Sequence, residues 1–600
     1  ASNVSIGADS MTTNTTGAEN VAVGASALYT NATTSYNVAI GAGALYTNAA
    51  ASNTGVGYHA LFANTTGADN VAVGKNALLS NTTASNNIAI GAESMDANTT
   101  GTQNTAVGKS SLGANTTGNY NVAFGAYSLD ANTTAEYNTA VGYTSAGANT
   151  TGTNNAAFGS FALGLNTTGS QNTAIGRSTL YQNTTASNNT AVGTSALNAN
   201  TTGANNVAVG TNALDANTTA ANNSAVGYGA LGGNTTGADN TAVGREALLS
   251  NTTGASNVAV GSTALDANTT GSNNTAVGQA ALTASTTASS QVAVGYAALS
   301  TCTTATGNTA VGYLAGQDVS TAVQNTLVGH AAGYNITTAN NNVFIGYGAG
   351  DACTTGTPNV AIGVGAYGAG GAGGGGQNTA IGYQTLTSAD SGANYNTALG
   401  HGAGFYVSTG DYNVAIGRAA DQVTTGGSFN ISIGPSAKPS AAGVSSETII
   451  GYNVTGNGTG TFTFGDGTTD TSCAFGGTTW SAPSDVRLKE DIQDEKVGLD
   501  FVNELRPVTY LWKKANEVPA ELDVHDPDSD DRVMNGKHNH GFIAQEVKEV
   551  IDRYDLKDGF ELWKEDPSDG RQRVGESALV PILVKAIQEL SAEVEKLKGA

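Results

Sequence analysis

The sequence predicts a mainly β protein: an elongated parallel β-solenoid or β-roll rod of 17-residue repeats, followed by an α+β domain that ends in a coiled-coil helix. Three observations predict it. A short motif recurs at nearly constant spacing through residues 1–451, the density of charge rises near residue 484, and an apolar heptad pattern closes the chain. With 80 glycines and only 12% charged residues, the composition fits an extended repeat protein better than ordinary globular domains.

The repeat is marked by the motif N-x-A-[VI]-G, whose final glycine recurs every 17 residues from Gly7 to Gly363, apart from one 16-residue step after Gly41. Steps of 19 and 18 residues follow, and the 17-residue spacing returns and continues to Gly451. If each unit is one coil, these 26 steps at ~4.8 Å per strand give a rod about 125 Å long.

A typical unit, starting at Asn70, reads NVAVGKNALLSNTTASN. Its first residues alternate with the period of a strand, so that Val71 and Val73 point one way and Ala72 and Gly74 the other. We expect the bulky valine face to be buried in the core, opposite a second wall that contains Ala77 and Leu78. We expect the bare Ala/Gly face to line an interface between subunits, since glycine allows close backbone approach.

The segment Asn81, Thr82 and Thr83 of this unit predicts a turn whose short polar side chains bond local backbone. Because asparagine returns at the same phase in each coil, its amides are also expected to stack in ladders along the rod. The recurring N-T-T is a glycosylation signal as well, but we favour the turn interpretation.

The three cysteines, Cys302, Cys353 and Cys473, are too few and too scattered for a disulfide framework or a zinc site, so we expect free thiols. Cys302 and Cys353 each lie seven residues after a motif glycine, at the position that asparagine usually holds in the turn. Three coils separate them, roughly 14 Å along the rod, which is beyond disulfide reach.

Two irregular segments interrupt the pattern. The insert GVGAYGAGGAGGGGQ, residues 363–377, has no GKS or GKT ending, so we predict a surface loop rather than a phosphate-binding loop. After Gly451 the motif steps shorten to 14 and 11 residues, and we interpret residues 452–483 as a tapering cap and linker.

Aromatic residues gather late in the repeats. Exposed rings suit the stacking of sugars, although packing in the core and at coil edges is the interpretation we favour for each one. The residues are Tyr367, Tyr383, Tyr395, Phe405, Tyr406, Tyr412 and Trp480.

Charge divides the chain at the segment TTWSAPSD. Residues 1–483 hold six of the 23 Lys/Arg and 19 of the 46 Asp/Glu, which leaves 17 and 27 for residues 484–600. Both parts are acidic, so we expect no nucleic-acid partner. No apolar run of about 18 residues occurs, so we expect no membrane insertion, and the first residues, ASNVSIGADS, lack the features of a secretion signal. The chain begins inside a repeat, so we expect a fragment or a mature product.

The end of the chain predicts a coiled-coil helix within about residues 577–600. Its apolar residues step by four, three, four and three, a heptad stripe that needs partner helices. They are Leu583, Ile587, Leu590, Val594 and Leu597.

Three segments in order resemble one family. SDVRLKEDI (484–492), GFIAQEVKEVI (541–551) and SALVPILVKAIQELSAEVEKL (577–597) are similar to the intramolecular chaperone domain of phage tail spikes and fibres, including endosialidase spikes, which is also found in myelin regulatory factor. The resemblance spans essentially all of residues 484–600. It implies a homotrimer and a domain that cleaves itself from the fibre. The earlier repeats resemble, less specifically, the head repeats of trimeric bacterial adhesins.

In that family the motif serine is the nucleophile and the lysine five residues later its base, which map here to Ser484 and Lys489. The resemblance places the scissile bond between Pro483 and Ser484. A serine hydroxyl needs a base, and lysine is a base only when neutral, a state that burial and a nearby cation favour. We expect Asp485 and Arg487 to shape the turn. Without the resemblance, Ser484 would be interpreted as a helix cap.

His538 and His540, beside the acidic loop DPDSDD at 526–531, raise the question of a metal. The loop lacks the glycine and final glutamate of a calcium-binding hand, and the histidines lack further ligands at suitable spacing. We therefore predict a solvated loop, no metal site and no cofactor.

We predict a homotrimeric phage tail fibre or spike shaft, located on the virion and extracellular, whose chaperone domain is released in the host cytoplasm during assembly. Its expected partners are a host-surface glycan or protein receptor and, at the amino-terminal end, the virion or an upstream fibre component. A cellular trimeric surface adhesin with the same chaperone is the alternative. A glycan-degrading tailspike ranks last, because the 19 acids of the rod are scattered over different phases of the repeat.

Overall fold

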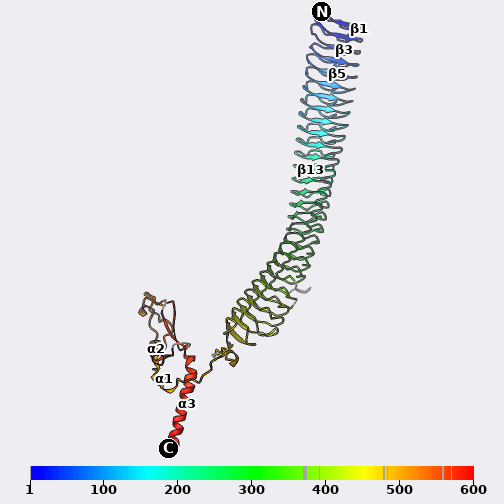
Figure 1. Ribbon diagram of the computed structural model, residues 1–600. Coiled ribbons are helices and arrows are strands. Elements are labelled where there is room, and N and C mark those ends of the chain that lie inside the picture. Colours follow the sequence, from blue (N-terminus) through cyan, green and yellow to red (C-terminus); the bar gives the residue numbers. More distant parts are fainter. Residues whose placement is uncertain are drawn as a thin grey trace. The chain divides into compact units, whose positions relative to one another are not determined.

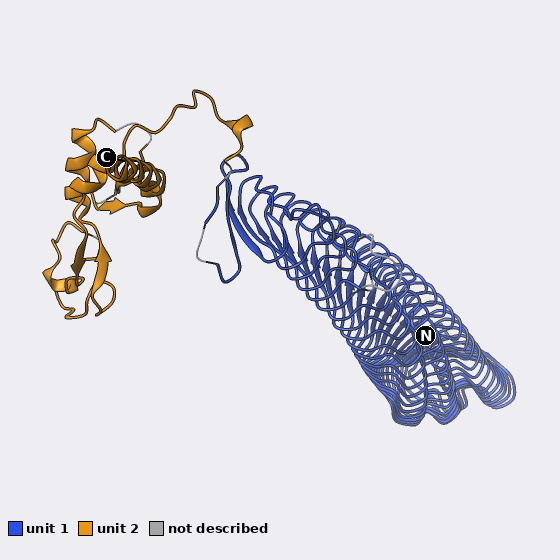
Figure 2. Cartoon of the chain, turned by 90° about the horizontal axis from the view of Figure 1, so that it is seen from below, with its two compact units in different colours: residues 1–483 blue, residues 484–600 orange. Residues whose placement is uncertain are grey.

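The computed structural model describes residues 2–368, 375–390, 392–477, 480–482, 484–522, 524–556, 560–568 and 570–599. The chain forms two compact units, residues 1–483 and residues 484–600, and each is described by itself (Figures 1 and 2).

The first unit is a stack of coils, each of which contributes one short strand to a single long sheet (Figure 1). Its strands are β1 Val4–Ile6, β2 Val21–Val23, β3 Val38–Ile40, β4 Thr54–Val56, β5 Val71–Val73, β6 Ile88–Ile90, β7 Thr105–Val107, β8 Val122–Phe124, β9 Thr139–Val141, β10 Ala156–Phe158, β11 Thr173–Ile175, β12 Thr190–Val192, β13 Val207–Val209, β14 Ser224–Val226, β15 Thr241–Val243, β16 Val258–Val260, β17 Thr275–Val277, β18 Val292–Val294, β19 Thr309–Val311, β20 Thr326–Val328, β21 Val343–Ile345, β22 Val360–Ile362, β23 Thr379–Ile381, β24 Thr397–Leu399, β25 Val414–Ile416, β26 Ile431–Ile433, β27 Thr448–Gly451, β28 Thr461–Gly465 and β29 Thr471–Ala474.

Neighbouring strands are parallel and in register from one repeat to the next. Val71 of β5 lies opposite Ile88 of β6, and the same correspondence continues through the shortened step, where Val38 lies opposite Thr54. The lengthened step is absorbed in the same way, since Val360 lies opposite Thr379. The predicted parallel solenoid with one coil per repeat is confirmed.

The prediction of which strand face is buried was wrong. Ala72 is completely buried, whereas Val71 and Val73 are partly exposed, and strand after strand repeats this arrangement. The second wall explains it, because Ala77 and Leu78 are completely buried, as predicted, and fill the thin interior. In β4, a methyl added at the inner position, Gly55, would lie 3.3 Å from Cγ of Leu45, so the inner slot has room for little more than alanine.

Exceptions to the alanine rule show that core volume is conserved. The inner strand residue is large in β20 and β21, as Leu327 and Phe344. In the facing wall, glycine replaces the usual leucine: a methyl on Gly316 would lie 2.6 Å from Leu327, and one on Gly350 would lie 2.3 Å from Phe344. Large and small residues are thus exchanged between the walls, as close packing requires.

We predicted that the motif glycines allow another subunit to approach closely. Instead, each one allows close approach of the next coil in the same chain. Gly74 has φ +137°, and a methyl there would lie 2.4 Å from the carbonyl oxygen of Gly91. Both the backbone conformation and the contact therefore exclude a larger side chain at this position.

The predicted asparagine ladder is confirmed. Nδ2 of Asn81 donates to Oδ1 of Asn64 one coil earlier at 2.9 Å and to the local carbonyl of Ala84 at 3.0 Å. A second ladder, which we did not predict, joins the motif asparagines: the backbone N–H of Asn87 donates to Oδ1 of Asn70 at 3.0 Å. Asn81 is completely buried, so folded coils cannot present it for glycosylation.

The cysteines are free, as expected, and they are also buried. Cys353 occupies the turn position of the ladder asparagine, and its thiol lies 3.6 Å from the carbonyl oxygen of Gly356. Burial raises the pKa of both Cys302 and Cys353 to about 11.

The glycine-rich insert lies partly outside the described residues, so its prediction as a surface loop stays a prediction. Tyr367, at its start, is buried at the position that leucine usually holds, and its hydroxyl donates to the carbonyl of Gly375 at 2.8 Å. The core interpretation is therefore correct for Tyr367. Other late aromatics, Tyr383, Tyr395, Tyr406, Tyr412 and Trp480, are exposed.

The parallel stack ends at a reversal of strand direction. β28 pairs in parallel with β27, but β29 pairs with β28 in antiparallel fashion. This hairpin gives the last coil a different edge, which fits the predicted cap.

The second unit is a small α+β fold. Its elements are η1 Val486–Leu488, α1 Leu499–Glu504, β30 Val508–Tyr510, η2 Ala515–Glu517, β31 Asn539–Gly541, α2 Ala544–Arg553, β32 Trp563–Glu565, β33 Gln572–Val574, η3 Glu576–Ala578 and α3 Leu579–Lys598. Two-stranded antiparallel sheets join β30 to β31 and β32 to β33. The core is centred on Phe501, which packs with apolar residues of α2 and α3, including Val547 and Ile582.

Candidate functional site

The segment 484–492 places a serine hydroxyl and a lysine amine together. Nζ of Lys489 donates a hydrogen bond to Oγ of Ser484 at 2.8 Å. The turn of η1 lies between them and brings residues five apart within reach. A nucleophile in contact with a candidate base is the minimum arrangement for nucleophilic attack on a carbonyl.

Asp485 and Arg487 hold this turn. Asp485 caps η1 by accepting the backbone N–H of Arg487 at 2.9 Å, so the cap belongs to Asp485 and not to Ser484. The two side chains also form an ion pair through the guanidinium. Hydrogen bonding to Arg487 lowers the pKa of Asp485 below its usual value. The carboxylate is therefore charged, and its oxygens accept hydrogen bonds from Arg487. Neither side chain is left in a form suited to proton transfer.

The pair of Ser484 and Lys489 is open to solvent, since both residues are exposed. Burial, which favours the neutral form of a lysine, is therefore not provided within this unit. Pro483, on the other side of the predicted scissile bond, lies outside the described residues.

The helix α3 carries both buried and exposed apolar side chains. Leu579, Ile582 and Ala586 are buried against the rest of the unit, and Glu589 accepts the backbone N–H of Leu499 at 2.8 Å, which ties α3 to the start of α1. The predicted heptad stripe continues toward the carboxyl end of the helix and is exposed, with exposed fractions of 65% at Ile587 and 78% at Leu597. The same holds for Leu583, Leu590 and Val594.

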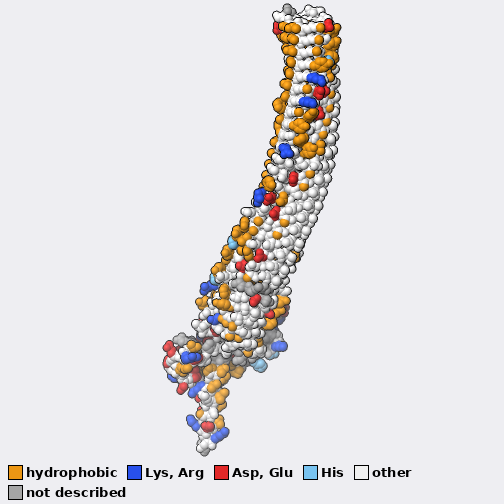
Figure 3. Space-filling model, turned by 90° about the vertical axis from the view of Figure 1, so that its right-hand side faces the viewer, with side chains coloured by type: hydrophobic (Ala, Val, Ile, Leu, Met, Phe, Trp, Pro, Cys, Tyr) orange, Lys and Arg blue, Asp and Glu red, His pale blue; other side chains and the backbone are white. Residues whose placement is uncertain are grey.

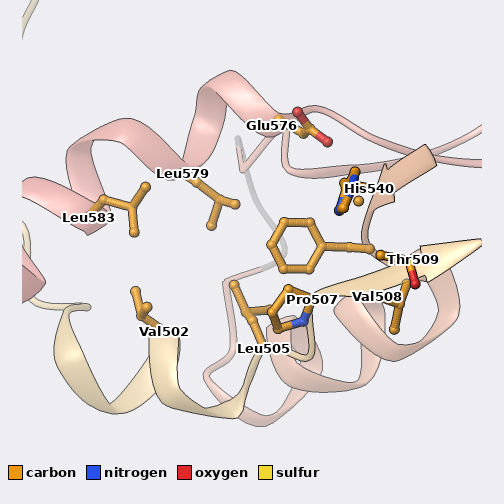
Figure 4. A pocket seen from close by; sticks show the side chains of 11 residues that line it. Val502, Leu505, Pro507, Val508, Thr509, His540, Glu576, Leu579 and Leu583 are labelled. Carbon is orange, nitrogen blue, oxygen red and sulfur yellow. The ribbon is translucent and has the colours of Figure 1, made fainter. Parts of the chain in front are cut away.

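An open apolar pocket of about 750 Å³ lies between α1 and α3 (Figure 4). Val502 and Leu505 face Leu579 and Leu583 across it, and His540 lies at its edge. Among the residues that the structure describes, no group of three His, Cys, Asp or Glu side chains could hold a metal ion. In the same described part of the chain, no helix is long and apolar enough to span a membrane.

Exposed rings form stacked rows on the rod, at the position directly after the motif glycine. Tyr296, Tyr313, His330 and Tyr347 follow one another with centroid distances of 5.3, 5.0 and 4.9 Å. All four residues precede the late aromatic residues named from the sequence, which begin at Tyr367. The sequence signal for this row is the repeat position. Residues that directly follow a motif glycine lie above one another in successive coils, so aromatic residues at that position stack.

Residues 484–556 match the model of the family described as the chaperone of endosialidase. The match begins at Ser484, includes the first two segments of the resemblance and ends before the third. It indicates an autoproteolytic chaperone at the carboxyl terminus. No curated protein and no solved structure matches the chain. A chaperone of this kind after a β-solenoid rod is consistent with a trimeric, fibre-like protein.

Proposed function

We propose that this chain is the shaft of a homotrimeric phage tail fibre or spike, whose last 117 residues align three copies and then cut themselves off between Pro483 and Ser484. The observation that carries the proposal is the 2.8 Å contact between Lys489 Nζ and Ser484 Oγ at the first residues of the family match.

The proposed chemistry needs only the chain and water. Lys489, in its neutral form, takes the proton of the Ser484 hydroxyl as Oγ attacks the carbonyl carbon of Pro483. The peptide C–N bond breaks, the amine of Ser484 takes up a proton, and an ester joins Pro483 to Oγ. Water then hydrolyses the ester, which leaves a carboxylate on Pro483 and restores the serine hydroxyl.

Assembly is the proposed trigger. In the single chain Lys489 is exposed, so its amine is not desolvated. Packing of the three chaperone units would bury this segment and favour the neutral amine. Cleavage would then follow correct assembly, and a chain that fails to assemble would keep its chaperone.

The test is denaturing electrophoresis with intact-mass measurement after expression. The wild-type chain should give two fragments separated at Pro483–Ser484, whereas Ser484→Ala and Lys489→Ala should stay whole. Since loss of transition-state base catalysis typically costs 10²–10⁴-fold, the variants should show less than about 1% cleavage over the same time.

Lys496→Ala is the matched control, because Lys496 is an exposed lysine twelve residues after Ser484. It should be cleaved like the wild type. Lys489→Arg keeps a positive charge but supplies no base, so it should also stay whole. A wild-type chain that remains intact as an assembled trimer, or a Lys489→Ala chain that is cleaved, contradicts the proposed mechanism.

We further propose that the shaft is part of the virion and attaches it to the host surface. The exposed ring row of Tyr296, Tyr313, His330 and Tyr347 supports a recognition role for the shaft, since exposed aromatic rows are uncommon without a partner. Binding of the cleaved rod to intact bacterial cells, compared with a variant in which Tyr313 and Tyr347 are serine, tests attachment. Equal binding of the two proteins would remove this row from the proposal.

A further inference from the structure

The strands β1–β27 share one outward face, formed by the first and third residue of each strand. The third residue is Val, Ile, Leu or Phe in each of these strands, and the first is Val, Ile, Thr, Ser or Ala. No charged residue occupies either position. Exposed fractions are 56% at Phe124, 41% at Phe158 and 36% at Val209, whereas other members of the face, such as Val73, are partly exposed.

The charges of the rod lie at other phases of the coil. Lys75, Lys109 and Arg177 directly follow motif glycines, while Asp96 and Asp130 lie five residues after them. Figure 3 shows hydrophobic side chains gathered in rows along the length of the rod, with charged side chains beside them. Depletion of charge on a surface built from Val, Ile and Thr is typical of an interface centre.

The size of this face also requires a partner. At ~4.8 Å per strand along the rod and ~3.3 Å per residue along a strand, it spans on the order of 125 Å by 10 Å, about 1,200 Å² per chain. The largest apolar patch on an ordinary monomer is about 300–600 Å², and a stable interface takes about 800 Å² from each partner.

We infer that this outward strand face packs against the same face of other copies of the chain, with the rods parallel and in register. A partner must offer a matching apolar repeat over the whole length of the face, and another copy does so coil by coil. The exposed heptad stripe of α3 is a second unpartnered apolar surface on the same chain, and it too is satisfied by parallel copies.

The inference rests on the proposed trimer and adds which side of the rod lies inside it. It reverses our expectation from the sequence, in which the Ala/Gly face lined the interface. It also assigns the ring row and the charges to the outer surface, where a receptor can reach them.

Single cysteines test the arrangement. Val23→Cys, Val209→Cys and Ile416→Cys place a thiol on the face near its two ends and its middle. In parallel, in-register rods each thiol meets its own equivalent, so mild oxidation should give covalent dimers on non-reducing denaturing gels for all three variants. Thr219→Cys is the matched control, since Thr219 is exposed in the turn of the coil that contains Val209, and it should remain a single chain.

The native mass of each variant separates the possible failures. A monomeric wild type overturns the proposed trimer itself. Two results would keep the trimer but overturn the inferred face. In the first, Thr219→Cys crosslinks and Val209→Cys does not; in the second, the Val209→Cys thiol reacts freely with a soluble maleimide. Either result leaves the face open for a different partner. Crosslinking at Val209→Cys but not at Val23→Cys or Ile416→Cys contradicts the parallel register.

Discussion

The glycine that ends each strand motif combines a backbone conformation and a contact that no other residue tolerates. Gly210 has φ +137°, and a methyl there would lie 2.4 Å from the carbonyl oxygen of Gly227 in the next coil. Because backbone lies on both sides of this contact, the coil cannot relax by moving a flexible side chain.

Gly210→Ala should therefore lower the stability of the rod by about 3 kcal/mol or more, from backbone strain together with the clash. The thermal midpoint of the rod, followed by circular dichroism, is the measurement. Gly443→Ala is the control, because a methyl at Gly443 meets no atom within 4 Å, and it should leave the midpoint unchanged. Equal effects of the two substitutions would show that stacking does not depend on this glycine.

The buried thiols offer a second test at the residue scale. With pKa values of about 11, Cys302 and Cys353 hold only about 0.1% thiolate at pH 8, against about 10% for an ordinary thiol, and both are sterically covered. A thiol-reactive dye should leave them unlabelled in the folded rod and label them fully in denaturant. Rapid labelling without unfolding would mean that these coils open locally.

At the scale of single elements, the alternation of side chains along each strand was predictable, but which of the two faces is buried was not. Alternation reveals two faces, but here both are apolar, so it does not say which one is inside. The answer depends on the volume that the opposite wall leaves, and only the structure reveals that Leu45 and its equivalents occupy it. The exchange of Leu327 with Gly316 is a signal that a paired comparison of the two walls within the sequence would have found.

The candidate site also has a part that the sequence pattern predicts and a part that it does not. Ser484 and Lys489 were identified through a family motif and not from spacing, since residues five apart meet only if the chain turns between them. That turn depends on the capping of η1 by Asp485. The heptad stripe of α3 was predictable from periodicity alone, because its side chains project from one regular helix.

The helix α3 makes a prediction about assembly. Leu590 lies on the exposed stripe, whereas the buried face of the helix holds Ile582. Leu590→Lys should leave the chaperone unit folded but abolish the proposed trimer, and cleavage should fall with it. Size-exclusion chromatography with light scattering reports the first effect, and electrophoresis the second.

Glu593→Lys, an exposed position of the same helix outside the stripe, introduces the same side chain and should preserve both trimer and cleavage. A Leu590→Lys protein that remains trimeric would contradict the assigned role of the stripe.

On the scale of the whole molecule, most shifted carboxyls of the two units have pKa values moved in opposite directions; Asp466 of the first unit is an exception, because hydrogen bonds from Thr468 and Thr469 lower its pKa. Burial raises the pKa of several rod carboxyls above the usual 3.8, among them Asp96, Asp215 and Asp421. In the second unit hydrogen bonds and ion pairs lower the pKa of carboxyls, to about 2 at Asp566 and below the usual value at Glu546.

A raised folded-state pKa means that the folded rod binds protons more tightly than the unfolded chain. The rod should therefore become more stable as pH falls from 7 toward about 4, that is, down to the ordinary aspartate pKa of 3.8. The chaperone unit should instead lose stability as pH falls below the ordinary carboxyl pKa values. Calorimetry of the uncleaved Ser484→Ala chain should show the two transitions move apart. Asp215→Asn should raise the midpoint of the rod at pH 7 and reduce its dependence on pH; transitions that shift together would contradict this assignment.

Each coil of the rod makes its backbone and asparagine hydrogen bonds with the coil before it and the coil after it. Removing or duplicating one unit in the gene, for example residues 207–223, would join two surfaces that already fit each other. The length of the rod is then free to change in steps of ~4.8 Å without any change in fold. A lineage that carries such a chain can adjust the reach of its rod by recombination between its own repeats, which is a heritable variation that a globular domain cannot offer.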